Sequence, residues 1–230
     1  MNNQNKIRTA SNSPSQYTGG ITIKSAQELE AMSKAGAVVG ATLTLLKKSV
    51  TPGMTTKDLD NIAIGEITRL GAKPAFLGYQ GFPASICTSV NEEIVHGIPG
   101  NRKLKEGDIV KVDCGATVDG FIGDAAVSIP VGDVSKEASD LMDATRESLN
   151  IGIQAAIPGN RIGDIGSAIQ KYAENLGYGV VREFVGHGIG RFLHEDPQVP
   201  NYGESGKGQL LRTGMCIAIE PMLNMGGWET

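Results

Sequence analysis

The sequence has 230 residues, enough to bury one sizeable hydrophobic core or two small ones. Hydrophobic residues make up 40% and charged residues 20%, which is typical of a globular protein, and a net charge of −4 offers no basic footprint for nucleic acid. No uninterrupted apolar run approaches the roughly 20 residues that cross a bilayer, and the N-terminus lacks the apolar stretch of a secretory signal. The three scattered cysteines (Cys87, Cys114 and Cys216) argue against a disulfide framework or a C-x-x-C zinc site and fit a reducing cytoplasm.

The first 20 residues are rich in Asn, Ser and Gln, which predicts a disordered polar tail over residues 1–20. The remainder, residues 21–230, is expected to form a single domain. Its first helix is predicted over residues 26–49, because Ser25 and Glu28 form a capping-box pattern at its start. A second long helix is predicted over residues 136–156.

Two segments of the chain resemble each other at a constant offset of 106 residues. Each reads as a turn, an amphipathic helix and a glycine that ends the helix, and each precedes β-like sequence. We expect strands near residues 85–90 and 109–129 in the first half, and near 180–185 and 215–220 in the second. Either an internal duplication or a coincidence of common dipeptides explains the three matching landmarks, which are Pro52-Gly53 with Pro158-Gly159, Asp58-Leu59 with Asp164-Ile165, and Leu70-Gly71 with Leu176-Gly177.

Residues 109–129 contain a β-hairpin signal, Asp119-Gly120, between β-forming residues. With these two residues as the loop, Asp113 lies opposite Ala126 and Asp124 lies opposite Gly115, so both carboxylates share one face, with Cα atoms roughly 7–8 Å apart. Small residues at the other two positions are expected to leave room for ions, and two metals about 3.5–4 Å apart fit if one carboxylate bridges them. The alternative is a solvated hairpin face with two unrelated polar residues.

Three histidines and one glutamate extend this candidate site. His96 lies in N-E-E-I-V-H-G-I-P-G, His187 and His194 lie in G-H-G-I-G-R-F-L-H-E-D-P, and Glu220 ends the expected strand C-I-A-I-E before Pro221. Carboxylates and one neutral imidazole suit divalent cations. A lone histidine is more often an ordinary core or surface residue, and Glu220 has the alternative of an exposed strand end.

Four motifs in order closely resemble type I methionine aminopeptidase of the bacterial form. They are G-Y-Q-G-F-P-A-S-I-C-T-S-V-N-E-E-I-V-H-G-I-P-G at 78–100, V-D-C-G-A-T-V-D-G-F-I-G-D-A-A at 112–126, and the histidine and glutamate motifs above. The resemblance covers residues 21–228. It implies the α+β pita-bread fold of the creatinase and aminopeptidase group, with two pseudo-symmetric halves around a central antiparallel sheet.

The resemblance also implies the chemistry. Asp113, Asp124, His187 and Glu220 would hold two divalent cations, for which cobalt, manganese, iron, zinc and nickel all qualify, and the metals would activate the attacking water. Glu220 would shuttle the proton. His96 would contact substrate near the amine and leaving group, His194 would contact the scissile carbonyl, and Tyr79, Phe82 and Cys87 would line the methionine pocket. The enzyme would remove initiator methionine, preferentially before a small residue.

The implied setting is a cytoplasmic monomer that acts on nascent polypeptides near the ribosome, with no nucleic acid or membrane partner. Two departures from the family pattern stand out. Leu193 replaces a frequent aromatic residue, and the family's second bridging glutamate would lie beyond Thr230, so we expect a C-terminally truncated chain, without its last strand or strands, that binds metal weakly and turns over little. The alternatives are an X-Pro aminopeptidase of the same fold, an inactive fragment and a non-catalytic binding protein.

Overall fold

In a computed structural model of the chain, residues 8–9 and 20–230 are described. Of the expected polar tail, the structure therefore describes only Gly20 and the short strand β1 (Arg8–Thr9), which pairs in parallel with β2 (Thr22–Ile23). The rest of the tail prediction falls outside the described residues. The chain divides into two compact units, one formed by Glu30–Ser139 and the other by Met1–Leu29 with Asp140–Thr230.

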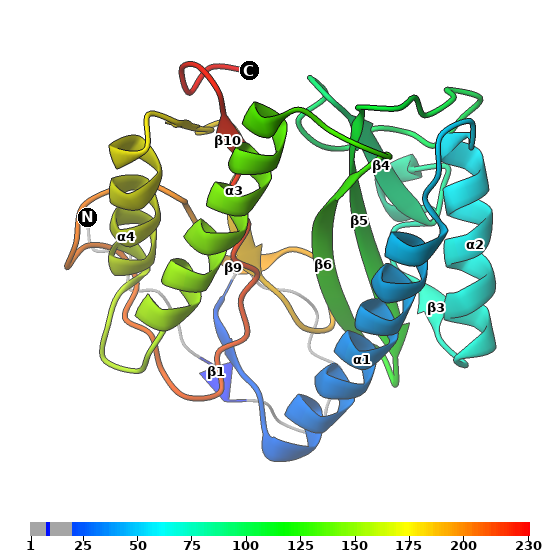
Figure 1. The fold of residues 1–230 in the computed structure, drawn as a ribbon. Helices are drawn as coiled ribbons and strands as arrows, with labels where there is room; N and C mark the ends of the chain where they lie inside the picture. The colour runs from blue at the N-terminus through cyan, green and yellow to red at the C-terminus, as the bar shows by residue number, and fades with distance from the viewer. Residues whose placement is uncertain (1–7, 10–19) are drawn as a thin grey trace. The chain divides into compact units, whose positions relative to one another are not determined.

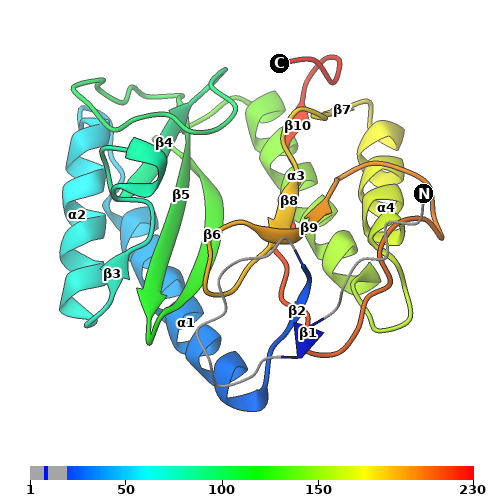
Figure 2. The same ribbon diagram turned by 180° about the vertical axis from the view of Figure 1, so that it is seen from behind.

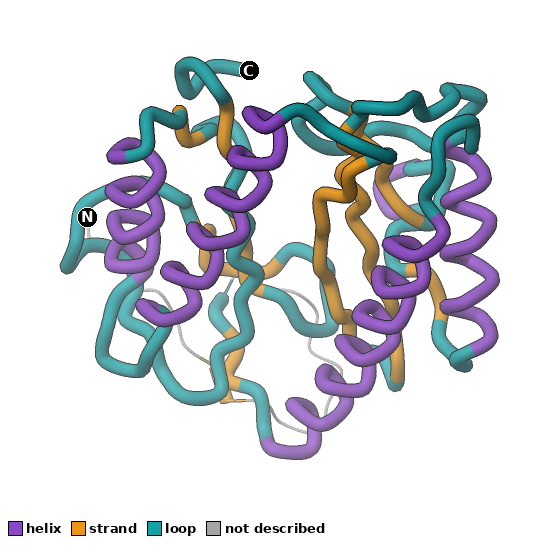
Figure 3. The backbone as a smooth tube through the Cα atoms, viewed as in Figure 1, coloured by secondary structure: helices purple, strands orange, loops and turns teal. Residues whose placement is uncertain are grey.

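The unit Glu30–Ser139 combines two helices with one antiparallel sheet (Figures 1 and 3). Its helices are α1 (Ala26–Ser49), which begins just before the unit, and α2 (Thr56–Arg69). The capping box expected at Ser25 is present, since the backbone N–H of Ser25 donates to Glu28 Oε2 at 2.9 Å. The strands are β3 (Lys73–Pro74), β4 (Ile86–Val90), β5 (Ile109–Val118) and β6 (Phe121–Pro130), and a 3₁₀ turn, η1 (Tyr79–Gly81), connects β3 to β4.

Strand β5 is the centre of this sheet. The hairpin partner β6 pairs with it along its whole length, with Val118 opposite Phe121 and Asp113 opposite Ala126, so the predicted register is confirmed. Strands β3 and β4 pair with β5 as well, and they must occupy its other edge because β6 fills the first.

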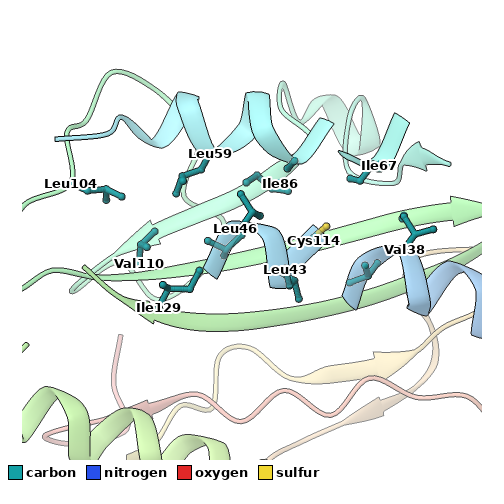
Figure 4. Packing of buried hydrophobic residues seen from close by; sticks show 14 of the residues in the cluster. Val38, Leu43, Leu46, Leu59, Ile67, Ile86, Leu104, Val110, Cys114 and Ile129 are labelled. Atoms are coloured by element: carbon teal, nitrogen blue, oxygen red, sulfur yellow. The ribbon is translucent and has the colours of Figure 1, made fainter. Parts of the chain in front are cut away.

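Side-chain alternation gives the sheet an apolar face and a polar face. Val110, Val112 and Cys114 of β5 point into the core, where they pack with residues of α1 and α2, including Leu46 and Leu59 (Figure 4). The odd-numbered residues of β5 therefore face away from these helices.

Helix α1 is long and apolar enough, by length and composition alone, to cross a membrane. Its 24 residues include a stripe of small and branched apolar residues that are buried at helical spacing. Val38, Val39, Leu43 and Leu46 from this stripe belong to the core of the unit, as expected for the core helix of a globular domain.

The other unit contains helices α3 (Lys136–Ala155), of which the first residues belong to the first unit, and α4 (Ile162–Asn175) (Figure 1). The two helices pack together through Ala144 and Ala173, which share a small core with Val180 and Leu223. Short antiparallel pairs complete the unit. β7 (Gly179–Val180) pairs with β10 (Leu223–Asn224), and β8 (Gly186–Gly188) lies beside β9 (Glu195–Val199) (Figure 2).

The repeat predicted from the sequence has a structural counterpart. Helix α4 begins and ends 106 residues after α2, and both helices have 14 residues. The backbone N–H groups of Thr55 and Arg161 donate to Asp58 and Asp164, each at 2.7 Å. The glycines of the flanking turns also correspond, since Gly53, Gly71, Gly159 and Gly177 all have positive φ. Each unit thus contains the same turn, helix and turn.

Two predicted strands of the second half were wrong. The expected strand over 180–185 ends at Val180, because continuing its register would set Arg182 opposite Pro221, and proline cannot donate to the ladder. Residues 215–220 form no regular strand. They run beside β8 through the hydrogen bonds Ile189 N–Cys216 O and Ala218 N–His187 O, but β8 has three residues and a register shift between His187 and Gly188. Because β8 is so short and irregular, it cannot form the regular strand pairing that residues 215–220 would need.

Candidate metal centre

Two carboxylates, Asp113 of β5 and Asp124 of β6, lie on the sheet face that points away from α1 and α2. They are diagonal neighbours, since Asp113 is opposite Ala126 and Asp124 is opposite Gly115. The Oδ1 atom of Asp113 is buried and has no hydrogen-bond partner among the described residues. Burial raises the pKa of Asp113 to about 6, against the opposing effect of its hydrogen bond with Asp124. Two acids held this close, with a buried acceptor atom left over, are what a cation would stabilise.

The reason for the small residues on this face differs from the sequence-based expectation. We expected Gly115 to leave room for ions, but a Cβ atom at this position would meet Cε1 of the Phe76 ring at 2.5 Å and Ala75 Cβ at 3.0 Å. The glycine therefore admits a buried aromatic ring beside the carboxylates. Phe76 supplies an apolar wall, which limits the access of water to this side of the pair.

Cys87 of β4 pairs with Asp113 across the strands, and its side chain lies on the same sheet face. Burial raises the pKa of the thiol to about 12, and the charges of Asp113 and Asp124 add to the effect. Cys87 is therefore a neutral, polarisable thiol beside the carboxylates and not a thiolate. Tyr79 and Phe82 are half-buried in the turn before β4, where the Phe82 N–H donates to Tyr79 O at 2.9 Å.

His96 lies on an exposed loop next to β4 and has a positive φ of 62°. The following glycine holds the loop against the strand, because Gly97 N donates to Ser89 Oγ at 3.0 Å and Gly97 O accepts from Thr88 N at 2.8 Å. A Cβ atom on Gly97 would meet Thr88 O at 2.3 Å, so no other residue fits there. The hydrogen bonds of Gly97 with β4 therefore fix the backbone position of the neighbouring His96.

In the unit formed by Met1–Leu29 and Asp140–Thr230, His187 is buried on β8. Its Nδ1 atom lies 2.9 Å from Gly188 O. A carbonyl can only accept, so Nδ1 carries the proton and Nε2 presents its lone pair. Burial lowers the pKa of His187 although Gly188 and Glu195 oppose the shift, so the ring stays neutral, as a metal ligand must. Both flanking glycines are needed, since a Cβ on Gly186 would meet Ala218 O at 2.3 Å and one on Gly188 would meet Asp196 O at 2.1 Å.

Glu220 and His194 are close to this imidazole within the same unit. His187 Nε2 lies 3.8 Å from Glu220 Oε1, a separation that lets one ion contact both atoms. The rings of His187 and His194 have centroids 4.3 Å apart at an interplanar angle of 56°. His194 is exposed, whereas the preceding Leu193 is buried and Phe192 is 41% exposed, so Leu193 is a packing residue at the position where the family often has an aromatic one.

The sequence reasoning missed two groups of residues that support the segments carrying His194 and Glu220. Asn201 is fully buried and its Nδ2 atom donates to the backbone oxygen of Glu220 at 2.7 Å. The buried carboxylate of Glu195 accepts a hydrogen bond from Lys24 Nζ at 2.8 Å. No sequence signal marked either contact, because they join residues that are 19 and 171 positions apart.

Comparison with known proteins identifies the family. Residues 30–229 match the model of metallopeptidase family M24. The chain belongs to this family. This M24 metallopeptidase is 54% identical to the methionine aminopeptidase of Clostridium acetobutylicum, over 90% of its own length and 83% of that relative. It is 52% identical to methionine aminopeptidase 1 of Bacillus subtilis, again over 90% of the chain and 83% of the relative.

Solved structures confirm the pita-bread fold of this M24 metallopeptidase. The methionine aminopeptidase of Rickettsia prowazekii matches with a TM-score of 0.89 and 42% identity, over 90% of this chain and 84% of that one. The prolidase of Pyrococcus furiosus matches with a TM-score of 0.75 and 25% identity, over 86% of this chain and 57% of that one. The likeness is thus greater to aminopeptidase structures than to this proline-specific enzyme.

Proposed function

We propose that this M24 metallopeptidase removes the N-terminal methionine from polypeptides, including nascent chains, preferentially when the next residue is small. The observation that carries the proposal is the 54% identity to a methionine aminopeptidase over 90% of the chain. At such identity over nearly the whole length, the residues that a shared chemistry needs can be compared one by one. The chain supplies four groups for this chemistry, the carboxylates of Asp113, Asp124 and Glu220 and the imidazole of His187.

The residues present fit a divalent cation. Asp113 offers a buried oxygen that accepts no hydrogen bond from the described residues, and His187 offers a neutral Nε2 atom 3.8 Å from a Glu220 oxygen. Three carboxylates and one imidazole form a mainly oxygen donor set, which suits metals from manganese to zinc. Two cations are our preferred number, since three carboxylates together offer six oxygens, and Asp124 would be the ligand that both cations share.

A bound divalent cation supplies Lewis acidity, which lowers the pKa of a water molecule and polarises a carbonyl group. The protein groups do the rest. Glu220 accepts a proton and delivers it to the departing amine, as a general acid–base group. His194 donates a hydrogen bond to the scissile carbonyl oxygen as negative charge develops there. His96, held out by the Gly97 contact with β4, binds substrate on the side of the amine and leaving group.

We attribute the specificity for methionine to contact between its side chain and the uncharged thiol of Cys87. A thiol with a pKa of about 12 carries no charge at neutral pH, and its polarisable sulfur suits contact with a thioether. Tyr79 and Phe82 add aromatic surface from the turn before β4. The sulfur of methionine makes favourable contacts with aromatic rings as well.

A peptide assay tests the function directly. Metal-free protein is reloaded with Mn²⁺ or Co²⁺ and given Met-Ala-Ser, Leu-Ala-Ser and an X-Pro peptide at equal concentrations. We expect metal-dependent release of methionine from Met-Ala-Ser and at least about tenfold slower release from Leu-Ala-Ser. Cleavage of only the X-Pro peptide would instead favour the activity of the prolidase-like relatives, and no cleavage with any metal would favour a non-catalytic role.

A further inference from the structure

A buried ion pair outside the proposed ligand set lies next to His194 in the chain. Lys24 Nζ and Glu195 Oε2 are 2.8 Å apart, and their side chains are only 5% and 4% exposed. Removing two charges from water is unfavourable unless further hydrogen bonds complete the pair. Glu195 Oε2 also accepts from Thr22 Oγ1 at 2.9 Å, and Lys24 Nζ donates to the same hydroxyl. Thr22 and Lys24 alternate along an extended segment, so both side chains reach Glu195 from one side.

The other oxygen of Glu195 holds the turn that leads to His194. Oε1 accepts from Phe192 N at 3.2 Å, and the turn is closed by Gly190 N, which donates to Phe192 O at 3.2 Å. The carboxylate fills the inside of this turn, because a Cβ atom on Gly190 would meet Glu195 Oε1 and Lys24 Cε at 2.7 Å each. Only glycine at 190 lets the turn close around the ion pair.

His194 therefore lies between two fixed points. The Phe192 N–H is bound to the carboxylate, and the next residue after His194 is Glu195 itself, which begins β9. Leu193 is buried, so it cannot swing out with the loop. The imidazole is exposed, yet its backbone is held on both sides at the place that sets its ring 4.3 Å from the His187 ring.

We propose that Lys24 and Glu195 are positioning residues that act through the Gly190–Phe192 turn to hold His194 for catalysis. The strand segment around Thr22 and Lys24 would then be part of the catalytic apparatus, although it supplies no group that touches substrate. This inference rests on the proposed function, in which His194 stabilises charge that develops on the scissile carbonyl.

The test compares Glu195→Gln with the wild-type chain in three measurements. We expect kcat on Met-Ala-Ser to fall at least about tenfold, while KM and the Mn²⁺ dissociation constant change less than about threefold, because an imidazole used in the transition state affects kcat. Amide hydrogen exchange should accelerate at least about tenfold more over residues 190–194 than in helix α4 of the same unit. Lys24→Arg, which keeps the charge, should retain more activity than Lys24→Met.

A milder variant and a matched control keep the result interpretable. Thr22→Val removes the two hydrogen bonds of the hydroxyl and leaves the ion pair, so a smaller loss of kcat is expected even if Glu195→Gln folds poorly. Asp164→Asn is the control, because Asp164 also accepts three hydrogen bonds that hold a loop of the same unit, from Arg161 N, Ser205 Oγ and Gly206 N. It should leave kcat and exchange at 190–194 unchanged.

Two results would overturn the positioning role. One is wild-type kcat in Glu195→Gln, and the other is a loss of activity matched by an equal loss of metal affinity and by exchange that accelerates to the same extent at 190–194 as in helix α4. If the wild-type chain itself cleaves no peptide, the proposed function fails, and the exchange measurement alone decides whether Glu195 holds the turn.

Discussion

Asp113 and Asp124 lie diagonally across the β5–β6 hairpin, each opposite a residue with little or no side chain, Ala126 and Gly115. Their positions follow from a two-residue turn at Asp119-Gly120, where both residues have positive φ. One inserted residue in either strand would move one carboxylate to the apolar face. The register of this one hairpin thus decides whether Asp113 and Asp124 share a face or whether one of them enters the hydrophobic core.

The first prediction concerns the bridging role of Asp124. We expect Asp124→Asn to weaken Mn²⁺ binding and to lower kcat/KM on Met-Ala-Ser by at least about 100-fold. An amide offers one neutral oxygen in place of a carboxylate, and even groups that only support a ligand are worth about 10–100-fold. Isothermal titration and the peptide assay measure the two effects.

The same hairpin provides the control for this substitution. Asp119→Asn makes an identical chemical change in the exposed turn, at a φ of 51° that asparagine adopts readily. It should leave metal binding and turnover within about twofold of wild type. Equal losses in the two variants would mean that Asp124 has no special role and that the bridge is misassigned.

The local pattern predicted the elements that depend on nearby residues. Helix α1 begins and ends where its capping residue and apolar spacing indicated, and the β5–β6 register followed from one turn. The offset between the repeats placed α4 once α2 was identified. In each case the determining interactions are close in sequence, so a pattern of a few residues is sufficient.

The failures depend on distant partners. Residues 215–220 read as a strand, but their neighbour β8 is too short and too irregular to complete a ladder. The role of Gly115 was misread because the ring it accommodates belongs to Phe76, 39 positions earlier in the chain. Lys24 and Glu195 lacked any local signal, since a buried ion pair is visible only when the tertiary structure joins its members.

The second prediction uses two glycines that the structure treats differently. Gly40 lies within α1 with nothing near its would-be Cβ atom, so Gly40→Ala should stabilise the protein by about 0.5–1 kcal/mol. Gly123 of β6 packs on α1, and a Cβ atom there would meet Gly36 N at 2.6 Å and Ala35 C at 2.7 Å. Gly123→Ala should therefore destabilise the protein by about 1–3 kcal/mol. Urea unfolding midpoints give both signs, and a stable Gly123→Ala variant would contradict the tight packing of β6 on α1.

The third prediction concerns the matched core positions of the repeat. Leu59 in α2 and Ile165 in α4 are 106 residues apart and both are fully buried. Truncation of either to alanine should cost about 2–5 kcal/mol, through lost apolar contact and the cavity that remains. Leu176→Ala is the comparison, since that leucine is 53% exposed and its truncation should cost less than about 1 kcal/mol. Similar losses at all three positions would contradict the assigned cores.

The last prediction is the pH dependence of the Lys24–Glu195 pair. Burial alone would raise the pKa of Glu195, but the hydrogen bond and charge of Lys24, with Phe192 N and Thr22, hold it below its ordinary value of 4.5. A carboxyl group with a lowered folded-state pKa stabilises the fold above its unfolded pKa and loses this contribution as the pH falls through the folded value.

At pH 7, Glu195→Gln should lower the free energy of unfolding by about 3–5 kcal/mol, because it leaves the Lys24 charge buried without its counterion. This difference from wild type should stay constant from pH 7 to about 5 and shrink as the pH falls below about 4.5, where the carboxyl group takes up its proton more readily in the unfolded chain than in the folded one. Urea unfolding of both proteins at pH 7, 5.5, 4.5 and 3.5 measures the difference directly and cancels the contributions of other acids such as Asp164. A difference that persists undiminished at pH 3.5 would show that the charge of Glu195 is not what stabilises the turn before His194.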